Sequence, residues 1–159
     1  ATVLARALRA RTLLEDGMLS TEGLLKNLSG LAKALAEQPA EGTEAELAGA
    51  MEAVEHINLV AWRYFVQRLP YEGLTVMQKA LDATDSDADT ELNPSPSRDL
   101  IISAFLFNLG FLRLASLGEY ESAADVLQQA HALRKPVLGE THTLTVQTVV
   151  SRGWALTLT

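Results

Sequence analysis

The sequence predicts an all-α protein, and three observations support this fold class. Hydrophobic residues make up 48% of the 159 residues and are dominated by Leu and Ala, which favour helices over strands. Apolar residues recur at three- and four-residue steps, and no segment has the two-residue alternation of a half-buried strand. The length is sufficient for one domain with a hydrophobic core.

Two helices are predicted at the N-terminus. The first covers residues 2–15, with Leu residues facing inward and Arg residues mostly outward. The second has Ser20 or Thr21 as its N-cap and ends at Pro39. We expect residues 1–46 to form a separate segment that caps the rest of the domain or fills its binding groove.

The third and fourth helices lie on either side of a proline. The third is expected to run from an N-cap at Thr43 to about Leu69. Pro70 is suited to a helix start, and the fourth helix is expected over about 71–83. An acidic stretch rich in Ser and Pro follows without a hydrophobic period, so we predict a loop at about 84–97.

Three further helices complete the chain. The fifth is expected over 98–117 and ends at Gly118, and the sixth is expected over 119–136. Gly139 allows a positive φ where the sixth helix ends. The seventh helix begins at about His142, whose ring can meet backbone groups of the turn.

The odd-numbered helices from the third onward share a small residue followed by a large aromatic one. The even-numbered helices also align, "LTVMQKALDA" with "ADVLQQAHAL", which gives a period in the forties. Such a period built from helix pairs is typical of an α-solenoid. The small residues predict close crossings between neighbouring helices. The three pairs are Ala61-Trp62, Gly110-Phe111 and Gly153-Trp154.

The stretch "LFNLGFLRLASLGEYESAADVLQQAHALRKPVLGETHTLT" resembles the tetratricopeptide repeat family, in the longer-repeat form of kinesin light chains. Its N-L-G, its G-x-Y and its A-L-x-x-R-x-x-x-L-G-x-x-H strings lie at 108–110, 118–120 and 132–142. The resemblance covers about residues 50–159 and departs from the family in two places. Arg152 replaces the usual Leu, and Leu117 is one residue too many before the following glycine.

The resemblance implies a solenoid of antiparallel helix pairs over 47–159, with extra helices at the N-terminus. In this family the odd-numbered helices line a concave groove that binds a peptide or helix of a partner protein. Asn108 is implied to hold the backbone of the peptide, because an amide both donates and accepts. The aromatic residues could instead belong to the core, and this alternative stays open. The expected groove residues are Asn58, Trp62, Phe65, Val66, Phe107, Asn108, Phe111, Leu114 and Trp154.

The predicted function is therefore a non-catalytic protein-interaction domain, a scaffold or adaptor. Two alternatives remain open. One is a homo-oligomerisation module that uses the apolar face of the C-terminal helix, and the other is a regulatory domain of a larger protein that senses a ligand or peptide. The apolar face consists of Val146, Val149, Val150 and Trp154.

Composition and motifs argue against several other classes. The net charge of −7 does not suit nucleic-acid binding. The absence of Cys excludes disulfides and thiolate metal sites and fits a cytoplasmic location. The three His are far apart, and GxSxG, Walker and GxGxxG motifs are absent, so no catalytic residue, metal or cofactor is expected.

No membrane span or calcium loop is expected either. The longest apolar stretch, "DLIISAFLFNLGFLRLASLG", is interrupted by Ser103, Asn108 and Arg113. The N-terminus lacks the pattern of a signal peptide. The acidic residues at 82–91 lack the glycine that an EF-hand needs at its sixth position.

Overall fold

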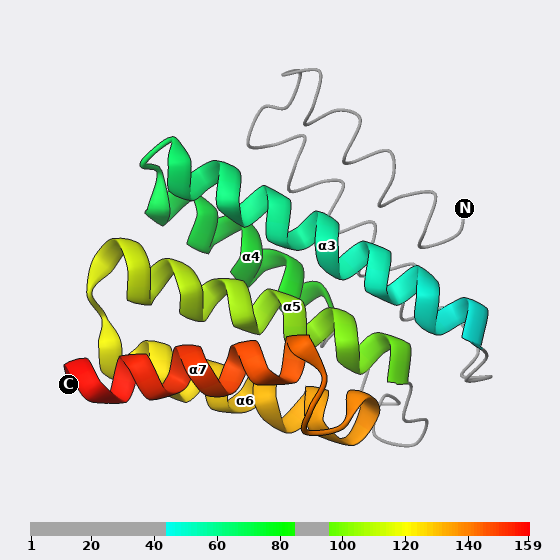
Figure 1. The fold of residues 1–159 in the computed structure, drawn as a ribbon. Coiled ribbons are helices and arrows are strands. Elements are labelled where there is room, and N and C mark those ends of the chain that lie inside the picture. The colour runs from blue at the N-terminus through cyan, green and yellow to red at the C-terminus, as the bar shows by residue number, and fades with distance from the viewer. Residues whose placement is uncertain (1–43, 85–95) are drawn as a thin grey trace.

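The computed structural model describes residues 44–84 and 96–159, and over these ranges the protein consists of packed helices without strands. The predicted helices at 2–15 and 20–38 and most of the acidic loop lie outside the described residues. The described helices are α3 (Glu44–Val66), α4 (Pro70–Thr84), α5 (Pro96–Leu112), α6 (Tyr120–Leu138) and α7 (Thr143–Leu158), and a π-helical turn, η2 (Arg113–Leu117), continues α5 (Figure 1). The predicted all-α class is confirmed.

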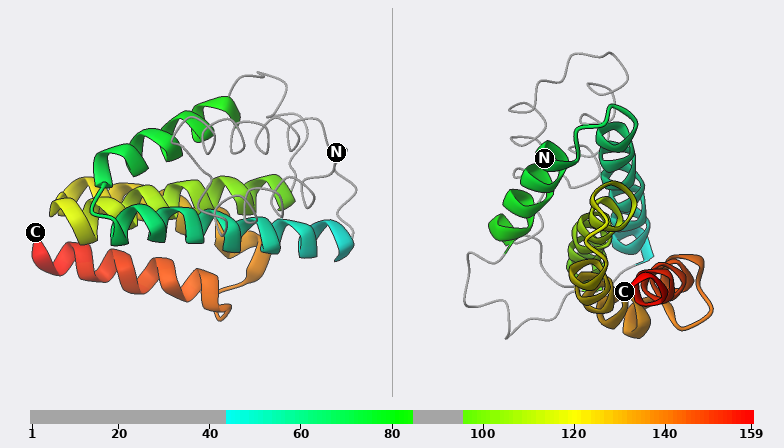
Figure 2. Two further views of the ribbon diagram at one scale, coloured as in Figure 1. Left: turned by 90° about the horizontal axis from the view of Figure 1, so that it is seen from above. Right: turned by 90° about the vertical axis from the view of Figure 1, so that its left-hand side faces the viewer.

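The helix α5 is the centre of the packing. It contacts α3, α4 and α6, whereas α7 packs mainly on α6. The helices α3, α5 and α7 run in one direction, and α6 runs against its neighbours α5 and α7 (Figure 1). Viewed along the helices, α4 lies on one side of α5, and α3 and α7 lie on the other (Figure 2). The helices α3 and α7, which carry Trp62 and Trp154, therefore lie on the same side of α5.

The helix ends follow the predicted turn chemistry in most places. Pro70 opens α4, and Gly118 and Gly139 have φ values of 66° and 84°. His142 is the N-cap of α7, and its Nδ1 accepts a 3.1 Å hydrogen bond from the Leu144 backbone N–H. The α3 helix ends at Val66 rather than near Leu69.

The sixth helix is longer than predicted. We expected it to end at about residue 136, but α6 includes Pro136 and ends at Leu138. Pro136 lacks the N–H that would donate to the Ala132 carbonyl oxygen, and its ring crowds that carbonyl, so it weakens the last turn of α6 but does not end the helix. The Gly139 N–H then donates to the Lys135 carbonyl oxygen over 2.9 Å and closes the helix.

The core follows α5 and the faces that surround it. Because α5 contacts three helices, it is apolar on nearly every side, unlike a surface helix. Together with η2 it forms a 22-residue helix, Pro96–Leu117, and an 18-residue window of this helix has a mean hydropathy of 1.9, so it is long and apolar enough to cross a membrane. The expectation that its polar residues exclude such a span is therefore wrong on length and composition. However, 61% of this window is buried, as in the core helix of a soluble protein.

Two helical glycines allow close packing, and a third does not contact a neighbour. A Cβ atom on Gly110 would lie 2.7 Å from Leu127 Cγ, and one on Gly73 would lie 3.0 Å from Tyr64 Cβ. The predicted close crossing at Gly110 is thus confirmed. At Gly153 the same prediction is wrong for the described residues, because a Cβ there would meet nothing within 4 Å.

Candidate functional site

Three of the predicted groove residues form an aromatic cluster between α3 and α5. The ring centroids of Trp62 and Phe65 lie 5.2 Å apart, those of Phe65 and Phe111 5.3 Å, and those of Trp62 and Phe111 6.3 Å. Phe65 and Phe111 are half-buried, whereas Trp62 is 53% exposed. On α3, the exposed side chains of Leu59 and Val66 extend the apolar surface on either side of Trp62.

The two asparagines among the predicted groove residues form a hydrogen bond with each other. Asn108 is buried, and its Nδ2 donates 2.7 Å hydrogen bonds to Asn58 Oδ1 and to the Ala104 carbonyl oxygen. Asn58 precedes Trp62 by four residues, and Asn108 precedes Phe111 by three, so the pair lies one turn before the aromatic cluster on both helices. The amide nitrogen that was expected to bind a peptide backbone therefore has two partners within the chain.

Phe107 contributes to a polar junction below the surface. The Arg134 guanidinium lies over its ring at 4.8 Å from the centroid. Arg134 Nε also donates to Ser103 Oγ over 3.0 Å, and Nη1 donates to the Leu144 carbonyl oxygen over 2.9 Å. Burial lowers the pKa of Arg134 to about 10. A single side chain of α6 thus connects α5 with the start of α7.

The other two predicted residues lie apart from the aromatic cluster. Leu114 is 8% exposed and packs with Ala123, Ala124 and Ala155, so it faces the interior. Trp154 is 62% exposed on α7, and none of the ring pairs found among the described residues joins it to the cluster. The predicted set is therefore divided between a surface cluster, a buried junction and a separate helix.

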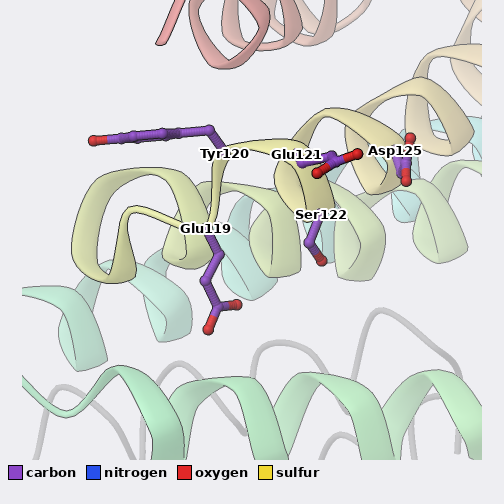
Figure 3. A pocket seen from close by; sticks show the side chains of 5 residues that line it. All are labelled: Glu119, Tyr120, Glu121, Ser122 and Asp125. Carbon is purple, nitrogen blue, oxygen red and sulfur yellow. The ribbon is translucent and has the colours of Figure 1, made fainter. Parts of the chain in front are cut away.

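Sequence reasoning missed a pocket at the start of α6. It has a volume of about 450 Å³ and is lined by Glu119, Tyr120, Glu121, Ser122 and Asp125. Glu119 and Ser122 point toward the same side, and the Tyr120 ring extends away from the acids (Figure 3). The string "GEYESAAD" contains these residues, and its pattern predicts a helix start and the G-x-Y string of the resemblance but no pocket.

The polar groups of this pocket have structural partners. Arg113 Nη1 donates to Ser122 Oγ over 2.7 Å, and Arg113 Nε lies 3.7 Å from Glu119 Oε2. Acidic residues in the first turn of a helix also stabilise it through the helix dipole. These roles account for Glu119, Glu121 and Ser122 as structural residues.

The described residues hold no cluster of metal ligands, and two of their carboxyl groups have shifted pKa values. Within 44–84 and 96–159, no group of three His, Asp or Glu residues could hold a metal ion. Burial raises the pKa of Asp99 in the first turn of α5, where Arg98 partly opposes the shift. The hydrogen bond from Lys135, at 3.0 Å, lowers the pKa of the exposed Glu140 carboxyl. Neither shifted carboxyl lines the pocket.

Comparisons of the chain with family models, with curated proteins and with solved structures found no match. The surfaces of the molecule itself are therefore the basis on which a function can be proposed.

Proposed function

We propose that this chain is a non-catalytic protein-interaction domain that binds an apolar peptide or helix of a partner protein at the aromatic cluster. The observation that carries the proposal is the exposure of Trp62 beside Phe65 and Phe111. A large aromatic side chain held by ring contacts and open to solvent is the type of residue that dominates binding energy at protein interfaces. Leu59 and Val66 widen the apolar surface around it.

The chemistry of the cluster indicates the chemistry of the ligand. No charged side chain belongs to the cluster, and the nearby Arg113 is already engaged by Glu119 and Ser122. We therefore expect apolar side chains of the partner, spaced along one face of a helix, to bury Trp62. A highly charged segment would gain little from this surface.

The proposal revises the role implied for Asn108. Because its Nδ2 is occupied by Asn58 and Ala104, we propose that it positions α3 against α5 rather than holding the ligand backbone. The affinity then comes from the burial of Trp62 by the partner's side chains. The asparagine pair fixes the position of Trp62 on α3 relative to Phe111 on α5.

The proposal includes the tetratricopeptide-like solenoid as its architecture. The common direction of α3, α5 and α7 and the alternation with α6 support it. The π-helical turn at Arg113–Leu117 supports it as well, because a π turn holds one residue more than an α turn and so accommodates the surplus at Leu117. The proposed adaptor or scaffold is cytoplasmic and binds neither nucleic acid nor membranes.

A selection from a library of displayed helical peptides tests this function. We expect the wild-type chain to enrich peptides with apolar residues at i, i+3, i+4 and i+7. Trp62→Ala should weaken their binding at least about 30-fold. Tyr71→Ala is the matched control, because Tyr71 is an exposed aromatic residue on α4 and should be neutral. Enriched peptides whose affinity is indifferent to Trp62→Ala would contradict the proposal.

A further inference from the structure

The helix α7 has an apolar face that none of the described residues covers. Its opposite side, with Thr145, Thr148 and Ala155 buried, belongs to the packed interior against α6. The outward side carries six large apolar residues that are each 42–62% exposed, over a helix of only 16 residues. They are Val146, Val149, Val150, Trp154, Leu156 and Leu158. We call these six residues, with Gly153 among them, the α7 face.

The α7 face is also uncharged. Arg152 is the only charged side chain of the helix, and it is half-buried. A helix with one side in water ordinarily carries charged residues on that side. The face exposes on the order of 500 Å² of apolar surface, near the upper limit for a patch on a monomer. A standard protein interface buries about 800 Å² on each partner, so the α7 face could supply most of one.

Gly153 gives a second reason to expect a helix on this surface. Glycine in a helix interior is unfavourable relative to Ala, and nothing within the described residues comes close enough to require it here. Gly110 shows what such a glycine permits, because Leu127 of the antiparallel α6 packs directly on its Cα. Gly153 offers the same close approach to a side chain from outside.

We propose that the α7 helix of a second copy covers this face, antiparallel to the first and crossing it near Gly153. A two-fold contact buries the same surface on both copies and needs no second complementary surface. Because the face is uncharged, it allows two chains of net charge −7 to meet without opposing like charges. In an antiparallel pair, the positive end of each helix dipole lies beside the negative end of the other. The pair can also seat Gly153 of each copy beside a larger residue of the other. This inference rests on α7 alone and is independent of the function proposed for Trp62.

Sedimentation of the 159-residue chain over a concentration series tests the pairing. The wild type should reach twice its 17.2 kDa mass. Trp154→Glu and Gly153→Leu should each weaken the dimer at least about 30-fold. Tyr71→Glu is the control for an exposed aromatic, and Gly49→Leu is the control for an open helical glycine, and both should dimerise as the wild type does. Far-UV circular dichroism should show unchanged helicity in all four variants.

The absence of Cys allows a direct test of orientation. Under oxidation, Val150→Cys should form a disulfide-linked dimer, because residue 150 lies near the crossing point. Leu158→Cys should not, because an antiparallel partner places the two copies of residue 158 far apart. A wild-type chain that stays at 17.2 kDa up to about 200 µM would overturn the inference. A dimer whose dissociation constant is unchanged by both Trp154→Glu and Gly153→Leu would also overturn it. So would a disulfide-linked dimer of the Leu158→Cys variant.

Discussion

Asn108 of α5 donates a 2.7 Å hydrogen bond from Nδ2 to Oδ1 of Asn58 on α3, one turn before the aromatic cluster. The same nitrogen donates to the Ala104 carbonyl oxygen, so both of its protons are engaged. This pair is a specific polar contact between α3 and α5. Its position indicates that it sets how Trp62 and Phe111 face each other.

Removing the asparagine pair should cost stability in a coupled way. Asn108→Ala should lower the free energy of unfolding by about 1 to 2 kcal/mol. It removes the donor of both hydrogen bonds, so the Asn58 Oδ1 atom and the Ala104 carbonyl oxygen each lose a partner. Asn58→Ala should cost less, since Asn58 is half-buried. Urea unfolding of both single variants and of the double variant should give a coupling energy of about 0.5 to 1.5 kcal/mol. Strict additivity would mean that the bond does not join the helices.

A matched pair of glycine substitutions tests the packing of α5 on α6. Gly110→Ala should destabilise the protein by about 2 kcal/mol or more, because the new Cβ would lie 2.7 Å from Leu127 Cγ. Gly49→Ala should stabilise it by up to about 1 kcal/mol, because Gly49 lies in a helix and no described residue would come within 4 Å of its Cβ. Thermal melts that move both variants in the same direction would contradict this explanation of Gly110.

Arg134 should matter more for its volume and hydrogen bonds than for its charge. Arg134→Ala should cost about 3 kcal/mol, because it opens a cavity and disconnects Ser103 and Leu144. Arg134→Met fills the same space without a buried charge and should cost less than half as much. Chemical denaturation of both variants measures the two costs, and an equal cost would show that the guanidinium itself is what the core needs.

The contribution of Arg134 to stability should not depend on pH near neutrality. Burial lowers the folded-state pKa of Arg134 to about 10, below the ordinary value of an arginine in the unfolded chain. Between these values the unfolded state binds the proton and the folded state does not, so this group makes stability rise with pH only there. From pH 6 to 9 both states are charged, and Arg134→Met should leave the slope of stability against pH unchanged. A changed slope in that range would contradict a folded-state pKa of about 10 for Arg134.

The π-helical turn should tolerate a deletion that α5 cannot. Removing the exposed Ser116 converts the turn Arg113–Leu117 to α-helical spacing and should change the free energy of unfolding by less than about 1 kcal/mol. Removing Ile102 in mid-helix rotates one half of α5 by about 100° against its neighbours and should unfold the domain. If both deletions are equally damaging in urea unfolding, the turn is not a site of surplus length.

The sequence predicted the helices better than the surfaces. Helix starts and stops depend on local chemistry. At the ends of α4, η2, α6 and α7, the residues Pro70, Gly118, Gly139 and His142 act as their residue types predict. The prediction at Pro136 was wrong because a proline weakens the turn that precedes it and does not prevent the helix from continuing for a few more residues.

The candidate site could be predicted only in part, because a helical pattern does not say which neighbour covers which face. Trp62, Phe111 and Trp154 occupy matching sequence positions, but only the first two meet in space. Leu114 has the spacing of a surface residue, but it is buried because α6 and α7 close over it. The partner of Asn108 lies 50 residues away, which no local pattern indicates.

The most direct test of the proposed binding surface is the fluorescence of Trp62 during titration with a selected peptide. The chain has two Trp residues, so the Trp154→Phe variant reports on Trp62 alone. We predict a saturable blue shift of the emission, because the ligand buries an indole that is now 53% exposed. The reverse variant, Trp62→Phe, should show no shift from Trp154. Saturable peptide binding that leaves the emission of Trp62 unchanged would contradict the claim that the aromatic cluster is the binding surface.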